Sequence, residues 1–543
     1  MARSSRPETN LALAVCIWIE RLGILFTKPI MNAIRPCLPV LFHLCLSALW
    51  TPFALQAKPL NVLILYADDL GYGDLRVNNP ASKIPTPHLN QLAQEGLRFT
   101  DGHSSSGICT PSRYALLTGR HHWRDFYGIV GVFGQSVFKP ERLTLPEMMQ
   151  QHDYVTACLG KWHLGWNWEA IKKTDAKPGK EGNRPMWTPD AFDWTQEIPD
   201  GPLDHGFDYY FGDTVINFPP YAWIENNKVT QIPDTVRDTS QWKKIKEGNW
   251  ECRPGPMVTG WDPYQNIPTI TQKGVDFIKQ QKHSAKPFFL YFAFPSPHAP
   301  IIPNDEFDGK SEAGPYGDFV YETDHAAGQL IAALKETGQY DETIIFFSAD
   351  NGPEHYAYAR DATYDHWSSA PFRGLKRDIY EGGHHVPFIL KWPGLTEPRT
   401  TSQALVSQID IMATLAAMVG HSLPDDAAED SHNLLPLLQG NVERIRDSHV
   451  HNTRMNQFAI RHEDWLLINA EQGYMSRRNK AWESKHNYPA DDAQATELYN
   501  LADDPGQRTN LANEHPATVE KLLTILATIR EQGYSAPRLT DRQ

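Results

Sequence analysis

The chain has 543 residues, of which 41% are hydrophobic and 21% charged, as is usual for a folded soluble protein too long for one small core. Its net charge is −14 and no basic stripe stands out, which argues against nucleic acid as a partner. An anionic ligand would need a local basic pocket in this acidic protein.

The first 57 residues predict an N-terminal extension followed by an export signal. Met31 begins a short basic region, residues 37–50 are apolar, and residues 54–57 offer a cleavage site with small residues. The apolar run is shorter than a membrane-spanning helix requires, so we expect cleavage rather than stable membrane insertion, with an uncleaved anchor as the alternative. We predict an exported protein, periplasmic or secreted, whose true start is Met31. The absence of Asn-x-Ser/Thr sequons favours a bacterial source.

Four continuously apolar runs predict strands that are buried on both faces. They are residues 60–67, 154–159, 288–294 and 343–349. Predicted helices cover residues 86–96, 269–282 and 318–337. The alternation predicts an α/β fold with a large, mostly parallel sheet sandwiched by helices, over a domain of residues 58–440.

After about residue 440 the pattern changes to short strands, expected at residues 458–461, 465–468 and 496–501. A helix over residues 516–532 closes the chain. We therefore predict a small C-terminal α+β domain with an antiparallel sheet over residues 441–543.

Polar residues follow each of the four predicted core strands. They are Asp68 and Asp69, Lys161 and His163, His298, and Asp350 and Asn351. In open α/β sheets, ligands bind at the carboxyl edge of the strands. The oxygen donors among these residues suit Ca²⁺ or Mg²⁺ better than zinc, although Asp-Asp and Asp-Asn-Gly sequences also occur as plain turns.

Cys109 begins the segment Cys-Thr-Pro-Ser-Arg, and Pro111 together with residues 112–118 predicts a helix that starts there. The helix N-terminus would favour a bound anion. The alternatives are a buried structural cysteine or a thiolate nucleophile. Two further cysteines outside the leader, Cys158 and Cys252, could form a disulfide or remain as buried thiols.

The segment from Cys109 to Arg120 resembles the signature of the type I sulfatases, in which the cysteine is oxidised to Cα-formylglycine (3-oxoalanine). Further segments match that family in the same order along nearly the whole chain after residue 61. They are residues 68–71, 160–163, His298, 350–352 and 373–383. The resemblance implies an alkaline phosphatase-like fold, a sulfatase activity, and a formylglycine-generating enzyme as the maturation partner.

The resemblance also implies roles for individual residues. Asp68, Asp69, Asp350 and Asn351 would hold one Ca²⁺ together with an oxygen of the modified Cys109. One hydroxyl of the hydrated aldehyde would attack sulfur, and deprotonation of the second would expel sulfate. A serine at this position has no second hydroxyl with which to do so.

The remaining matched residues would surround the sulfate group. Arg113 would steady the hydrated aldehyde, and Lys161 and Lys376 would bind sulfate oxygens. His163 would support proton removal, and His298 with Lys376 would help to protonate the departing alcohol. One departure is His385, where many relatives carry Arg, so that a supporting role at this position is in doubt or has become sensitive to pH.

Segments 203–208 and 314–318 resemble the branch that contains galactose- and N-acetylgalactosamine-6-sulfatases, which suggests a 6-O-sulfated galacto-sugar as substrate. The polar and aromatic segment 354–372 is either a sugar subsite or an ordinary surface loop. The alternative functions are a phosphodiesterase or phosphonate hydrolase of the same fold, a broad arylsulfatase, and a sulfated-glycan binding protein with unmodified Cys109.

Overall fold

A computed structural model describes residues 59–476, 478–489 and 496–538. The extension and signal peptide predicted for residues 1–57 lie outside this part of the chain. A search of the described helices for a segment both long and apolar enough to cross a bilayer found no candidate.

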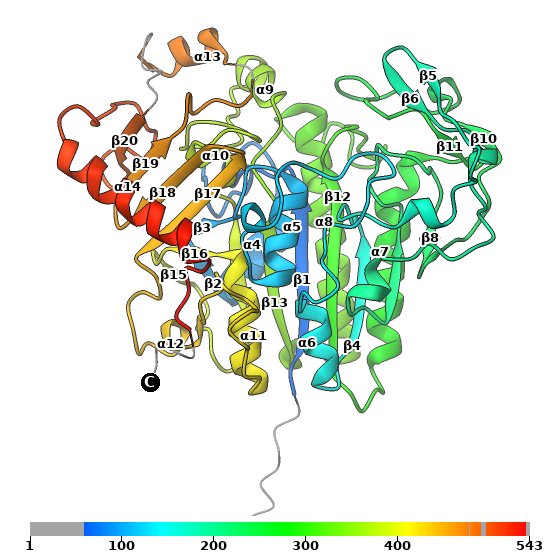
Figure 1. Ribbon diagram of the computed structural model, residues 1–543, viewed down its shortest axis with the longest axis horizontal. Helices are drawn as coiled ribbons and strands as arrows, with labels where there is room; N and C mark the ends of the chain where they lie inside the picture. Colours follow the sequence, from blue (N-terminus) through cyan, green and yellow to red (C-terminus); the bar gives the residue numbers. More distant parts are fainter. Residues whose placement is uncertain (1–58, 477, 490–495, 539–543) are drawn as a thin grey trace, which may run out of the picture. The chain divides into compact units, whose positions relative to one another are not determined.

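The centre of the molecule is a ten-stranded sheet with the order β15-β2-β14-β13-β1-β12-β4-β7-β8-β9 (Figure 1). The strands are β1 (Asn61–Asp68), β2 (Leu97–Phe99), β4 (Val155–Gly160), β7 (Tyr209–Gly212), β8 (Ile224–Glu225), β9 (Lys228–Val229), β12 (Phe288–Pro297), β13 (Thr343–Ala349), β14 (Phe388–Lys391) and β15 (Thr400–Ser402).

The middle of this sheet is parallel, as the sequence predicts. Strand β1 lies between β12 and β13, and Val62 pairs with Phe289 on one side and Ile344 on the other. Strands β4 and β7 continue the parallel set, whereas β14, β8 and β9 pair antiparallel towards the two edges. The carboxyl ends of β1, β4, β12 and β13 therefore meet at one edge.

Helices cover both faces of the sheet. Alternate residues of β1 enter two different cores: Ile64 packs with the helices α5, α6 and α11, and Leu65 with α4, α7 and α8 (Figure 1). The helices of the first face are α5 (Cys109–Thr118), α6 (Leu145–Gln151) and α11 (Ile411–Val419), and those of the second face are α4 (Pro87–Glu95), α7 (Asn266–Gln281) and α8 (Gly314–Thr337).

The predicted elements are present, with small differences at their ends. Helix α5 already begins at Cys109, two residues before the proline that signals it. Helix α8 begins four residues earlier than predicted, because Gly314 and Pro315 form its first turn rather than a preceding loop. Segment 354–372, for which the sequence analysis considers a surface loop, contains the helix α9 (Ala357–Tyr364).

A second, four-stranded antiparallel sheet with the order β17-β18-β19-β20 lies in the C-terminal region and is packed against α14 (Pro516–Glu531). Its strands are β17 (Ser448–Arg454), β18 (Gln457–His462), β19 (Trp465–Asn469) and β20 (Thr496–Asn500). The sequence did not predict β17, since this strand is mostly polar and yet buried. The boundary near residue 440 stays a prediction.

The described residues also form shorter strands and α-helices. They are β3 (Gly102–His103), β5 (Gly179–Glu181), β6 (Arg184–Met186), β10 (Thr235–Val236), β11 (Pro256–Met257), β16 (Val406–Ser407), α10 (Glu381–His384), α12 (Leu435–Leu438) and α13 (Lys480–Lys485). Cys158 and Cys252 are free and buried, so the two-thiol alternative holds and the disulfide does not form.

Candidate active site

Three carboxylates meet at the carboxyl ends of β1 and β13. The neighbouring strands run in register to Ala67 and Ala349, which places Asp68 and Asp350 side by side. The backbone N–H of Asp69 donates to Asp350 Oδ1 over 3.2 Å. The side chains of Asp68, Asp69 and Asp350 are all buried. They lie at the carboxyl edge of the strands, where the sequence predicts a ligand site.

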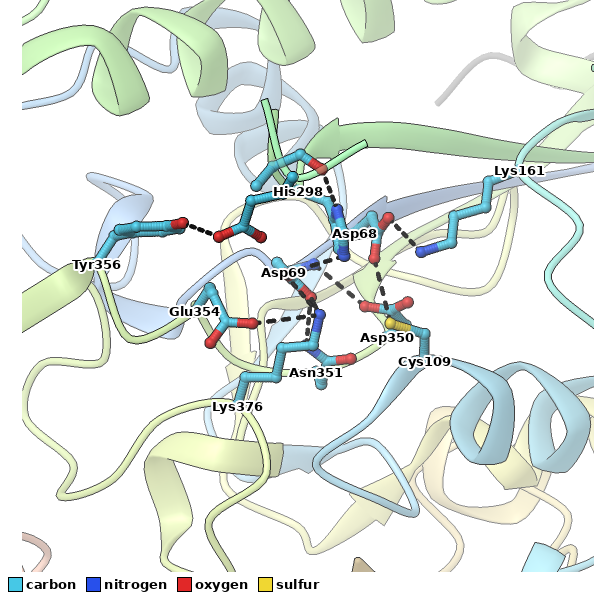
Figure 2. Close-up of polar contacts among 12 residues, drawn as sticks. Asp68, Asp69, Cys109, Lys161, His298, Asp350, Asn351, Glu354, Tyr356 and Lys376 are labelled. Carbon is cyan, nitrogen blue, oxygen red and sulfur yellow. Dashed lines mark hydrogen bonds and ion pairs between the residues drawn. The ribbon is translucent and has the colours of Figure 1, made fainter. Parts of the chain in front are cut away.

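Cys109 faces this group from the first turn of α5 (Figure 2). Its Sγ lies 3.6 Å from Asp68 Oδ1, and its side chain is buried. Burial and the negative charge of Asp350 raise the pKa of the thiol to about 12, although Lys161 and Lys376 act in the opposite direction. The unmodified residue is therefore a protonated thiol, which argues against the thiolate alternative.

Three cations surround the carboxylates. Lys161 Nζ, just after β4, lies 2.5 Å from Asp68 Oδ2, and Lys376 Nζ lies 2.7 Å from Asp69 Oδ1. Arg113 donates to Asp350 Oδ2 from Nε over 3.1 Å and from Nη2 over 2.8 Å. Each carboxylate is thus paired with at least one cation, and the two lysines come from different parts of the chain: Lys161 follows β4, and Lys376 lies in the segment before α10.

The donor set fits a hard divalent cation. The Oδ1 atom of Asn351 is buried and accepts no hydrogen bond from the described residues, while its Nδ2 donates to Asp69 Oδ1 over 2.7 Å. Burial raises the pKa of Asp69 and of Asp350, and Asp68 adds to the effect on Asp350. A cation bound among these oxygens would favour the ionised form of these buried carboxylates and occupy the free lone pairs of Asn351.

His163 has one free nitrogen. Its Nε2 lies 3.0 Å from the carbonyl oxygen of Val130, which can only accept, so that Nε2 carries the proton. Nδ1 is buried and has no partner among the described residues. Burial and the charges of Lys161 and Arg113 hold the pKa of His163 well below its usual value, so the ring is neutral and Nδ1 has a free lone pair.

His298 follows β12 and lies beside Asp69 (Figure 2). Its Nδ1 is 2.5 Å from the carbonyl oxygen of Ala299, and its Nε2 is 3.8 Å from Asp69 Oδ2. Burial and Lys376 lower the pKa of His298 to about 3. All residues predicted for the site thus lie in or beside one cluster.

Two features of the site were not predicted. Glu354 bonds Arg377 and lies 3.9 Å from Lys376 Nζ, and the hydroxyl of Tyr291, on β12, accepts from Arg113 over 3.4 Å. Tyr291 lies within an apolar strand run, so the sequence gives no signal for it. Glu354 comes shortly after Asp350-Asn351-Gly352 in the sequence. This closeness to predicted metal ligands could have suggested that Glu354 belongs to the site.

The segment 354–372 is more buried than a surface loop. Tyr358 and Trp367 pack with Trp482 in a small aromatic core, and Arg360 is buried against Tyr316. Tyr356 remains partly exposed and bonds Glu251 (Figure 2).

Two family models match parts of this chain. Residues 60–421 match the family model for Sulfatase, and residues 374–532 match the model for N-sulphoglucosamine sulphohydrolase, C-terminal. The chain belongs to the sulfatase family. This sulfatase is a sulfuric ester hydrolase, as the resemblance in the sequence implied.

Several relatives cover most of the sulfatase. An N-acetylgalactosamine-6-O-sulfatase of Bacteroides thetaiotaomicron is 31% identical in an alignment of 509 residues that covers 87% of this chain and 93% of the relative. A solved B. thetaiotaomicron chain from work on the metabolism of multiple glycosaminoglycans is 28% identical, with a TM-score of 0.70 over 88% of this chain and all (100%) of that one.

The fold extends beyond sulfatases. The phosphonate monoester hydrolase of Agrobacterium radiobacter is 17% identical, with a TM-score of 0.54 over 87% of this chain and 96% of that chain. This likeness shows the shared fold alone. The alkaline phosphatase-like fold predicted from the sequence is confirmed.

Proposed function

We propose that this sulfatase removes the sulfate ester from a sulfated carbohydrate, with 6-O-sulfated galactose or N-acetylgalactosamine as the substrate, and that it acts outside the bacterial cytoplasm. The observation that carries the chemistry is the position of Cys109, buried at the start of α5 against Asp68 and Asp350 and flanked by Lys161 and Lys376. The sugar rests on the names of the relatives.

We propose that Cys109 is converted to formylglycine by a formylglycine-generating enzyme, and that Asp68, Asp69, Asp350 and Asn351 hold one Ca²⁺ together with this residue. When bound, the metal would neutralise charge on the sulfuryl oxygens, and the hydrated aldehyde would provide a nucleophilic hydroxyl. Arg113 holds Asp350 by two hydrogen bonds and so fixes the orientation of this carboxylate.

The cations and the histidines have distinct proposed tasks. Lys161 and Lys376 bind sulfuryl oxygens, because they reach the carboxylate group from two sides. His163 accepts a proton at Nδ1, which has a free lone pair. Burial alone would lower the pKa of Lys376, but Asp69 raises it, so the lysine stays protonated and can donate to the departing alcohol. His298, which also lies beside Asp69, orients that alcohol.

The test is sulfate release by protein that is co-expressed with a formylglycine-generating enzyme and whose aldehyde at position 109 is verified by peptide mass spectrometry. Galactose 6-sulfate, N-acetylgalactosamine 6-sulfate, their 4-sulfated isomers, an aryl sulfate and an aryl phosphodiester are offered side by side. Preferential turnover of a 6-sulfated galacto-sugar supports the proposal. Turnover of the phosphodiester alone would replace it by a phosphodiesterase or phosphonate hydrolase, and equal turnover of aryl sulfate and sugars by a broad arylsulfatase.

A further inference from the structure

A second group of metal-type side chains lies outside the proposed active site. It consists of His103 on β3, Glu381 and His384 on α10, and His451 on β17. One possible ligand atom of each residue lies within 4.8 Å of those of the other three, and all four side chains are buried. Strand β17 belongs to the C-terminal sheet, but at this point it packs beside β3 and α10 (Figure 1).

His103 and His384 face each other with their Nδ1 atoms. His384 Nε2 is 3.1 Å from the carbonyl oxygen of Ile379, and His103 Nε2 is 2.6 Å from a carboxylate oxygen of Asp101. Both of these partners accept, so each Nε2 carries a proton and each Nδ1 points into the group. The two Nδ1 atoms are only 3.3 Å apart, which lets them share one proton in a hydrogen bond or bind one cation together.

The distance suits a tetrahedral metal ion. Two nitrogens bound to zinc at 2.0–2.1 Å with a tetrahedral angle are about 3.3–3.4 Å apart. The outer hydrogen bonds of both rings also follow the usual pattern of metal-bound histidines, whose second nitrogen donates to a carboxylate or a backbone carbonyl. Asp101 and the carbonyl of Ile379 supply these acceptors.

The other two members have polar atoms without partners. Both ring nitrogens of His451 are buried and make no hydrogen bond to any described residue, and the ring stacks on His384 with centroids 3.6 Å apart. Glu381 is fully buried, and its Oε1 is likewise free in the described part of the chain, while Oε2 bonds His385. Buried polar groups of this kind are costly unless a ligand satisfies them.

We propose that His103, Glu381, His384 and His451 form a structural zinc site, separate from the proposed calcium site. Four protein ligands in a buried position leave no open coordination site, which is typical of structural rather than catalytic zinc. The ion would join β17 of the C-terminal sheet to β3, six residues before Cys109, and to α10, five residues after Lys376. It would thus help to hold the two segments that carry active-site residues.

The sequence carries a signal for this site in its residue spacing. Glu381 and His384 are three apart, which puts them on one face of a helical turn. His449 and His451 are two apart on β17, so they share one face of the strand. His385, the departure from the family pattern, bonds Glu381 Oε2 over 2.7 Å and so orients this carboxylate.

The test is the metal content of the full-length protein after expression with zinc chloride in the medium and gel filtration in zinc-free buffer. We expect one bound zinc per chain by elemental mass spectrometry, lost in His451→Ala and in Glu381→Gln. His122→Gln is the matched control, because His122 is buried but bonds Asn452 instead. Asp350→Asn should also keep its zinc, since that substitution affects only the other site.

X-ray absorption at the zinc edge of the wild-type protein keeps the proposal testable if the variants fail to fold. Four nitrogen and oxygen neighbours at about 2.0–2.1 Å, with the multiple scattering of imidazole, support the site. A wild-type protein that retains no zinc overturns it. So does zinc that is retained by His451→Ala or lost in Asp350→Asn, because the ion would then lie elsewhere.

Discussion

The surroundings of Cys109 make its thiol a poor nucleophile. Burial keeps the thiol protonated, and the nearest acceptor of its proton, Asp68, is already paired with Lys161. The proposed conversion to formylglycine would put a hydrated aldehyde at this position instead of the thiol.

Replacing Cys109 by Ala should therefore abolish turnover and leave folding intact. We expect kcat to fall by on the order of 10⁴-fold or more, as when a nucleophile is removed. Sulfate release and thermal unfolding measured together check this prediction. Cys158→Ala is the control, because Cys158 is equally buried but lies on β4 away from the carboxylates. Wild-type activity of Cys109→Ala would end the formylglycine mechanism.

Asp213 makes stability depend on pH. Burial raises its pKa to about 7, although a hydrogen bond from Asn266 acts in the opposite direction. The folded-state pKa lies above the unfolded value of about 3.9, so the stabilisation present at acidic pH is lost as the pH rises through 7. Between pH 5 and pH 8, Asp213→Asn should gain about 2 kcal/mol of unfolding free energy relative to wild type.

Denaturant unfolding at several pH values measures this difference. Asp464→Asn changes an exposed carboxylate, and its free energy of unfolding should depend on pH as that of the wild type does. If the free energy of unfolding of Asp213→Asn also depended on pH as in the wild type, Asp213 would be ionised over this whole pH range.

At the scale of elements, the ends of the strands were predictable and the loops were not. Continuous apolar runs fixed β1, β4, β12 and β13, and the rule for the carboxyl edge of parallel strands then brought Asp68, Lys161, His298 and Asp350 together. Strand β17 was missed because its buried face carries histidines instead of apolar residues. Its burial depends on partners far away in the sequence, which periodicity cannot reveal.

The carboxylates at the ends of β1 and β13 predict how the activity responds to a chelator. EDTA should lower activity by at least about 100-fold, because three buried carboxylates lose their shared cation, and Ca²⁺ should restore it. Asn351→Leu removes one oxygen ligand and should raise the Ca²⁺ concentration needed for half recovery by roughly 10-fold or more.

Titration of the chelated protein with Ca²⁺ gives this concentration. Asn227→Leu is the control, since Asn227 bonds Glu197 outside the site. Full activity in excess EDTA would contradict a metal in this cluster, unless the ion exchanges too slowly to be removed, which elemental analysis of the same sample decides.

At the scale of the whole molecule, the C-terminal region and the catalytic region share buried polar contacts. Asp378 Oδ1 accepts from the backbone N–H groups of Met475 and Ser476, and the hydroxyl of Tyr380 donates to Glu497. The N–H of Glu381 donates to Gln507 Oε1 over 2.9 Å. These contacts all involve the segment that follows Lys376, so the proposed C-terminal domain supports the site without lining it.

Deleting residues 441–543 should therefore prevent folding rather than release a smaller active enzyme. Each of the three contacts named above leaves a buried donor or acceptor unpaired, at a cost of about 1–3 kcal/mol apiece, and the deletion also uncovers the apolar side chains of Trp123 and Ile379, which pack against the C-terminal sheet. Circular dichroism and thermal unfolding of the truncated chain test this. Gln507→Ala, which removes only the bond to Glu381, should stay folded and lose about 1–3 kcal/mol. A truncated chain that unfolds cooperatively would instead show that residues 58–440 fold on their own, and that the contacts of the 378–381 segment are dispensable for the catalytic domain.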